Sequence, residues 1–212
     1  IGLAGELGAG ITLIAELLPK EKRGIGTSFV AGLGLTGAVA AYFVSQAFDW
    51  RVCYFIGGGM GLLLLLLRVS VFESTMFHAV KKLNVKRGNF LMFFNNRERA
   101  KKYFISILIG LPTWYVIGVL VTFSDKFGEA FNLQEAIAPG KAIMFAYIGI
   151  SIGDIVIGFV SQWLRSRKKA LYVFYALTAL FIALFFLQDG GSSSTMYAIC
   201  AGLGFATGVW AT

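Results

Sequence analysis

Charged residues are scarce in this chain of 212 residues, where they make up 14% while hydrophobic residues make up 57%. Soluble globular domains carry about 25% charged residues, so this composition excludes an ordinary soluble fold. Apolar runs long enough to cross a bilayer core of about 30 Å recur instead. We expect them at 1–18, 24–47, 52–70, 103–123, 141–164, 169–187 and 196–212. The sequence therefore predicts an all-α polytopic membrane protein with about seven transmembrane helices.

Residues that catalyse reactions or bind metals are also rare. His78 is the single histidine, and Cys53 and Cys200 lie in apolar surroundings without metal-ligand spacing. No GxxxxGK[ST] motif is present. These absences exclude zinc, serine-hydrolase and P-loop chemistry. We therefore expect no catalytic residue, no cofactor and no metal, and the protein is not expected to be an enzyme.

The net charge of +8 does not indicate a nucleic-acid partner, because the basic residues lie in loops between apolar runs and not on one face of a soluble domain. Only Arg51, Lys126 and Lys141 of the 19 lysines and arginines lie outside the stretches 19–23, 68–102 and 165–169. Basic residues in short loops stay in the cytoplasm. We therefore predict that loops 19–23, 73–102 and 165–169 are cytoplasmic, in a multi-pass protein of the inner (plasma) membrane.

The stretch 73–102 is the long hydrophilic segment of the chain, and it separates three apolar runs from four. A connector of this kind is natural between two helical bundles. We predict that residues 1–72 belong to a first bundle and residues 103–212 to a second, with 73–102 as a central cytoplasmic loop. Since both ends of the chain lie within apolar runs, we expect it to be an internal piece of a longer protein.

Carboxylates inside membrane spans are costly, so each is a functional hypothesis. Glu6 lies 12 residues before Leu18 and Asp154 lies 11 residues before Arg165, which places them about 18 Å and 16 Å from the cytoplasmic ends of their helices. Burial raises the pKa of a carboxylate, which suits it to carry a proton. We predict proton or substrate coupling at Glu6 and Asp154, with hydrogen bonding to a neighbouring helix as the structural alternative.

Three aromatic residues are candidates for a substrate cavity. Trp114 and Tyr115 follow Pro112, which interrupts a helix, and Trp210 lies in the last apolar run. Ordinary aromatic packing is the alternative for all three. The Gly32, Gly34 and Gly37 pattern matches a dinucleotide fingerprint, but it lies inside a long apolar run where no strand precedes it. We interpret these glycines as helix-packing positions.

Two segments resemble a known family. Residues 153–168, GDIVIGFVSQWLRSRK, resemble the second copy of the signature loop of the major facilitator superfamily, between its eighth and ninth helices. The segment 5–24, with Glu6, Glu16 and Pro19 to Gly24, is similar to the end of the fourth helix in the sugar and metabolite:proton symporter branches. The resemblance implies that the chain covers helices four to ten, without helices one to three and eleven to twelve.

The resemblance also implies a cytoplasmic gate that latches the two halves. By position, Arg165 and Arg167 would be its cations, Gly158 would permit close packing, and Glu16 and Arg23 are further candidates. The family's usual loop acid is replaced by Gln162, so this half of the latch would lack its charge.

The function implied is secondary active transport of a small solute by alternating access, most simply as a proton-coupled symporter working as a monomer in the lipid bilayer. Alternatives are an efflux antiporter of the same fold and, from other classes, a multi-pass membrane enzyme or a sensor that does not transport. The sequence does not identify the substrate, the coupling ion or the direction of transport.

Overall fold

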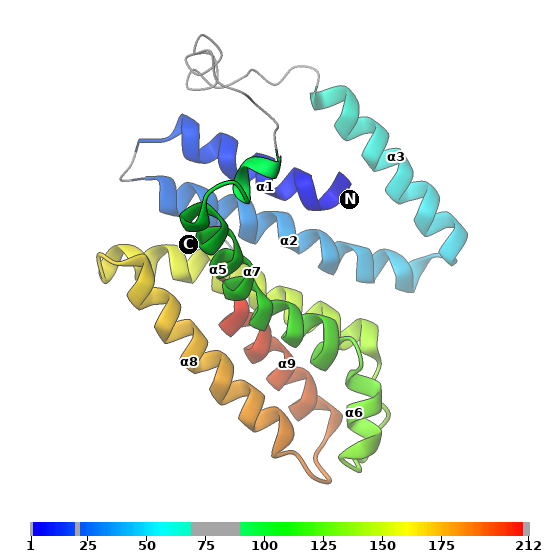
Figure 1. Cartoon of the computed structure of the whole chain (residues 1–212). Helices are drawn as coiled ribbons and strands as arrows, with labels where there is room; N and C mark the ends of the chain where they lie inside the picture. Colours follow the sequence, from blue (N-terminus) through cyan, green and yellow to red (C-terminus); the bar gives the residue numbers. More distant parts are fainter. Residues whose placement is uncertain (1, 20–21, 69–89, 210–212) are drawn as a thin grey trace.

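The computed structural model describes residues 2–19, 22–68 and 90–209, without the side chains of residues 2–7 and 90. Within these ranges the chain consists of helices and turns and contains no strand (Figure 1). The helices are α1 (Gly2–Leu17), α2 (Arg23–Ala47), α3 (Trp50–Arg68), the short η1 (Phe90–Phe93), α5 (Arg97–Tyr115), η2 (Val116–Val121), α6 (Ser124–Ala130), α7 (Pro139–Trp163), α8 (Arg167–Phe186) and α9 (Ser193–Thr207).

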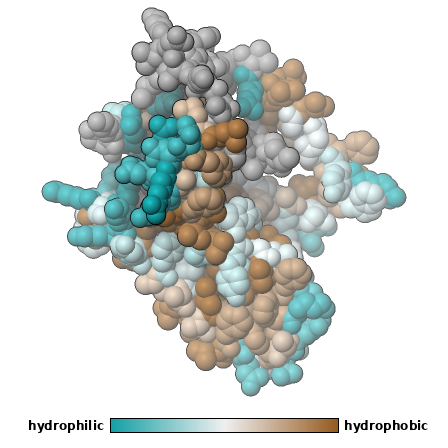
Figure 2. Space-filling view, viewed as in Figure 1, coloured by the Kyte–Doolittle hydropathy of each residue, from teal (hydrophilic) through white to brown (hydrophobic). Residues whose placement is uncertain are grey.

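Each of the seven predicted apolar runs overlaps a long helix, and the run 103–123 overlaps both α5 and η2. Five are long and apolar enough to cross a membrane, namely α2, α3, α5 together with η2, α7 and α8, while α1 contributes a shorter apolar segment and α9 has 15 residues. In Figure 2 hydrophobic side chains cover much of the centre and lower part of this face, and hydrophilic side chains gather at its left, right and lower edges. The prediction of an all-α polytopic membrane protein is therefore confirmed.

The helix ends follow from local chemistry. Side-chain oxygens of Asn96, Ser166 and Ser192 accept hydrogen bonds from backbone N–H groups in the first turns of α5, α8 and α9. Pro139 stands in the first turn of α7, where its missing N–H costs nothing. Pro112 lies inside α5, and the chain continues directly into the π-helix η2. The irregularity predicted around Pro112 is thus present.

The long helix α7 is central to the packing. It contacts α2 on one side and α9 on another, and α8 packs against both α7 and α9. Buried side chains from η2, α7 and α9, together with Phe185 of α8, form the main hydrophobic core. By contrast, α3 has no buried residue and touches its neighbour α2 only near the turn between them (Figure 1).

The division into bundles 1–72 and 103–212 stays a prediction. In the described structure, α2 from the first range and α7 from the second lie side by side over much of their length. Their contact is therefore the surface through which the two predicted bundles meet.

Candidate functional site

Small residues bring α2 and α7 together at what we call the α2–α7 junction, formed by Gly24, Ser28 and Gly32 of α2 and Ser151, Gly158 and Ser161 of α7. A Cβ atom on Gly24 would lie 3.9 Å from the Ser161 hydroxyl, and one on Gly158 would lie 2.8 Å from the Ser28 Cβ. As residue numbers rise along α2, the residue numbers of the contacting positions on α7 fall, so the two helices are antiparallel. The ends that bear loops 19–23 and 165–169 therefore meet on the same side.

Further along the junction the helices remain close. A Cβ atom on Gly32 would lie 2.7 Å from the Ser151 carbonyl oxygen and 2.9 Å from the Ile155 side chain. Gly32, Ser28 and Gly24 are spaced by four residues and therefore share one face of α2. Small residues at this spacing allow backbones to approach closely where no hydrophobic force draws helices together in lipid.

A second close contact joins α7 to α9. A Cβ atom on Gly204 would lie 2.7 Å from the Ala146 carbonyl carbon, and one on Gly208 would lie 2.6 Å from the backbone nitrogen of Asp154. Gly149 and Gly153 of α7 face α9 in the same way. Helix α7 is thus held between two neighbours by glycine-mediated contacts.

Asp154 lies between these two contacts. It is fully buried, with an exposed fraction of 0%. Along the helix it follows Gly153, which faces α9, and precedes by four residues Gly158, which faces α2. The candidate carboxylate that the sequence placed deep in a span is therefore at the place where α2, α7 and α9 converge.

Buried threonines surround the end of α9. The Thr178 hydroxyl of α8 has two acceptors for its one proton, the Phe174 carbonyl of its own helix at 2.9 Å and the Ala206 carbonyl of α9 at 3.0 Å. The Thr113 hydroxyl of α5 donates to the Thr207 carbonyl at 3.5 Å. The Thr207 hydroxyl donates to the Leu203 carbonyl at 2.9 Å. Sequence reasoning missed these residues, although isolated threonines inside apolar runs are a usable signal, since their hydroxyls need partners.

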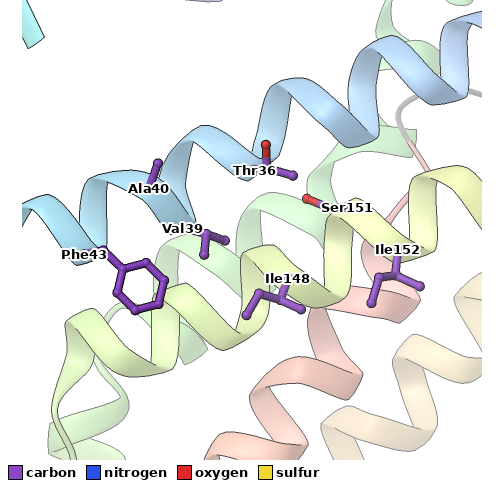
Figure 3. A pocket seen from close by; sticks show the side chains of 7 residues that line it. All are labelled: Thr36, Val39, Ala40, Phe43, Ile148, Ser151 and Ile152. Carbon is purple, nitrogen blue, oxygen red and sulfur yellow. The ribbon is translucent and has the colours of Figure 1, made fainter.

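A cavity of about 430 Å³ opens between α2 and α7 beyond the close contact at Gly32. Figure 3 shows Val39 and Phe43 of α2 and Ser151 of α7 in the space between the helices. The Ser151 hydroxyl is buried and has no hydrogen-bond partner among the described residues. Among the residues that the structure describes, no charged side chain lines the cavity, whose walls are Thr36, Val39, Ala40, Phe43, Ile148, Ser151 and Ile152.

The gate candidates lie at the end of the junction that carries the basic loops. Arg23 begins α2, and its Nε donates to the Leu18 carbonyl at 3.0 Å, which ties α2 to the end of α1. Glu16 is half-buried in the last turn of α1. Arg165 has a positive φ of 50° in the turn between α7 and α8, and Arg165 and Arg167 are exposed. The structure thus gathers Gly158, Arg23, Arg165 and Arg167 at one end, and their role as a gate stays a prediction.

The structure does not place the other candidates at this site. Glu6 lies in α1, but its side chain is outside the described structure, as is all of Trp210. Trp114 and Tyr115 have exposed fractions of 60% and 43%, and neither lines the cavity between α2 and α7. Their part in a substrate cavity remains a prediction. Within the described residues, no group of His, Cys, Asp or Glu side chains is arranged to hold a metal ion.

The sequence model of the Major Facilitator Superfamily matches residues 1–212. The chain belongs to this superfamily. The resemblance to this superfamily is thereby confirmed, and the superfamily consists of transporters and not of enzymes. The position of α2 and α7 at the meeting of two predicted bundles agrees with a transporter in which two groups of helices face each other.

Three curated relatives align with most of the chain. The sialic acid transporter of Escherichia coli strain K12 is 26% identical over 205 residues, 91% of this chain and 48% of that protein. The probable 4-methylmuconolactone transporter of Cupriavidus pinatubonensis is 26% identical over 157 residues, 70% of this chain and 35% of that protein. An inner membrane metabolite transport protein of Escherichia coli strain K12 is 24% identical over 205 residues, which are 87% of this chain and 45% of that protein.

The chain therefore spans about half the length of these relatives or less. No solved structure matches it.

Proposed function

We propose that the protein containing this chain is a secondary transporter that moves a small organic solute by alternating access, with proton coupling through Asp154. The observation that carries the proposal is the burial of Asp154 at the convergence of α2, α7 and α9. An ionisable group inside a membrane span is retained where it serves an ion or substrate pathway. Asp154 lies beside the contact that must rearrange if the two predicted bundles move apart.

The α2–α7 junction supplies the moving contact. Helices that pack through small residues can separate without withdrawing long side chains from a partner, because the contacting surfaces are nearly flat. Opening the junction would expose the neighbourhood of Asp154 to water on one side of the membrane. A carboxylate that alternates between burial and hydration is suited to bind and release a proton.

The relatives support a small organic solute as the substrate class. Two are named as transporters of sialic acid and of 4-methylmuconolactone, and a third as an inner membrane metabolite transport protein. Together with the distribution of lysine and arginine, they favour a bacterial inner membrane with loops 19–23, 73–102 and 165–169 in the cytoplasm. Glu6 is the second candidate for coupling, and Glu16 for the gate.

The test uses the complete protein in proteoliposomes that contain a pH-sensitive dye. Solute uptake and internal acidification are followed for wild type, Asp154→Asn and Glu6→Gln, with sialic acid and 4-methylmuconolactone among the solutes offered. Asp189→Asn is the matched control, because Asp189 is an exposed carboxylate in the turn between α8 and α9. We expect wild type and the control to acidify the lumen during uptake.

For Asp154→Asn we expect downhill solute exchange to continue while proton movement is lost, because the amide fills the same space but does not titrate. Uptake without acidification in the wild type would refute coupling and leave a transporter. If proton movement still accompanied solute uptake in Asp154→Asn, Asp154 would have a structural role and no part in proton coupling. Absence of transport for every solute in a folded wild-type protein would count against the proposed function as a whole.

A further inference from the structure

Helix α5 ends in two consecutive irregularities. Pro112 has no backbone N–H, so the Leu108 carbonyl lacks the donor that a regular helix would supply. Four residues later the chain enters the π-helix η2. Prolines and π-helical turns are the usual places where a long helix bends. The two irregularities therefore mark a place where the inner part of α5 can change its angle to η2.

The two sides of this place are held in different ways. Val116, Leu120 and Val121 of η2 are fully buried and belong to the main hydrophobic core, together with residues of α7 and α9. Before Pro112, the Tyr175 hydroxyl of α8 donates to the Ile109 carbonyl at 2.6 Å. Packing thus fixes η2, whereas a directional hydrogen bond joins the preceding part of α5 to α8.

A second hydroxyl can reach the same carbonyl. Thr113 is four residues after Ile109, and a threonine hydroxyl in a helix can donate to the carbonyl four residues before it. The Thr113 hydroxyl donates instead to the Thr207 carbonyl at 3.5 Å, which is longer than the usual O–H···O distance of about 2.5–3.0 Å. The Thr207 carbonyl also accepts from the Val209 N–H at 2.9 Å. The Thr113 hydroxyl can therefore turn to Ile109 while the Thr207 carbonyl keeps a donor.

We propose that Pro112 is a hinge of α5 and that Tyr175 and Thr113 form a hydrogen-bond switch that sets its angle. In the joined form, which the structure shows, Tyr175 donates to the Ile109 carbonyl. In the tilted form, residues 97–111 move away from α8, Tyr175 is released and the Thr113 hydroxyl donates to that carbonyl. Each form gives the carbonyl a side-chain donor, as a helix interrupted by proline in a membrane requires.

This movement goes beyond the proposed function, because it takes place inside the second predicted bundle and not between the two bundles. Since η2 stays in the core, a tilt of residues 97–111 displaces the beginning of α5 and leaves its other end in place. A hinge of a few residues can open one side of a site while the rest stays packed. The tilt widens the opening on the side of loops 73–102 and 165–169, and its place in transport rests on the alternating access proposed above.

The experiment measures distances between spin labels in the complete protein. The first pair is at Lys102 and Lys168, exposed residues near the beginnings of α5 and α8, and the second pair is at Lys126 and Asp189, exposed residues beyond the other ends of η2 and α8. Both pairs lie within the second predicted bundle, so movement of one bundle against the other leaves both distances unchanged. We expect two populations for the first pair and one for the second.

Two variants should shift these populations in opposite directions. Tyr175→Phe removes the hydroxyl that holds the joined form, so we expect the longer distance of the first pair to gain about 3-fold in population, equivalent to about 0.6 kcal/mol. Thr113→Val should lower that population, because it removes the donor that the tilted form needs. Bonds with a merely structural role would not give opposite shifts. Tyr172→Phe is the matched control, since Tyr172 belongs to the same helix and is 73% exposed.

A change in the second pair together with the first would mean that α5 tilts as one rigid helix, which would overturn the hinge. Equal shifts in Tyr175→Phe and in the control, or shifts of the same sign in Tyr175→Phe and Thr113→Val, would overturn the switch. If a variant folds poorly, the labelled protein without further substitution still decides, because a single population for the first pair refutes the proposal. Solute uptake by the wild type tests the proposed function separately.

Discussion

A methyl group added to Gly158 should push α2 and α7 apart. The Cβ of alanine at this position would lie 2.8 Å from the Ser28 Cβ and 3.4 Å from the Gly24 carbonyl oxygen. Ser28 has little room to move, since it is 1% exposed and its hydroxyl donates to the Gly24 carbonyl at 2.7 Å. Overpacking of this kind costs about 1–3 kcal/mol.

This cost applies only while the two helices are in contact. Gly158→Ala should therefore shift the ratio of packed to separated forms of the α2–α7 junction by about 5- to 150-fold, at 1.36 kcal/mol for each factor of ten. The proposed alternating access supplies the separated form. The variant should accordingly favour the state in which loops 19–23 and 165–169 are apart.

The assay is the distance between spin labels at Lys22 and Lys168, two exposed lysines near the ends of α2 and α7. We expect a longer distance to gain population in Gly158→Ala. Gly34→Ala is the matched control, because it changes helix propensity equally but its Cβ meets nothing within 4 Å. Adding Ser28→Gly to Gly158→Ala should restore the wild-type distribution, since it removes the atoms that collide.

An unchanged distance distribution in Gly158→Ala would refute the reasoning, as would an equal change in the Gly34→Ala control. Failure of Ser28→Gly to compensate would show that the effect arises elsewhere than in this contact.

Two further predictions concern the contacts of α9. Gly204→Ala should destabilise the protein by about 3 kcal/mol, because the new Cβ would lie 2.7 Å from the Ala146 carbonyl carbon, a backbone atom that cannot rotate away. Thermal unfolding in detergent measures the loss of stability. A Tm equal to that of Gly34→Ala would contradict the prediction. Thr178→Val keeps the shape but removes the hydroxyl that can donate to the Ala206 carbonyl, so we expect a loss of about 0.6 kcal/mol, with an upper limit of about 2 kcal/mol. An unchanged Tm would contradict this prediction and would indicate that the proton goes to the Phe174 carbonyl of the same helix.

The transmembrane helices were predictable because length and hydropathy alone decide whether a segment can lie in a bilayer. Their ends were less so. Helix α5 begins at Arg97, six residues before the predicted run at 103, because Asn96 caps it and basic residues are good helix formers. Hydropathy indicates where the membrane begins and not where the helix begins. The part of a helix that extends into the polar region is therefore not predicted by hydropathy.

The sequence by itself determined the family, the helical class and the place of Asp154 inside a long apolar helix, since these follow from motif, composition and hydropathy. Only the tertiary structure decided which small residues carry contacts. Gly32 meets α7, whereas Gly34 and Gly37 meet nothing within 4 Å in the described structure. The rotation of a helix about its axis depends on all of its neighbours together, and for that reason the convergence of Asp154, Gly158 and Gly208 could not be derived from spacing along the chain.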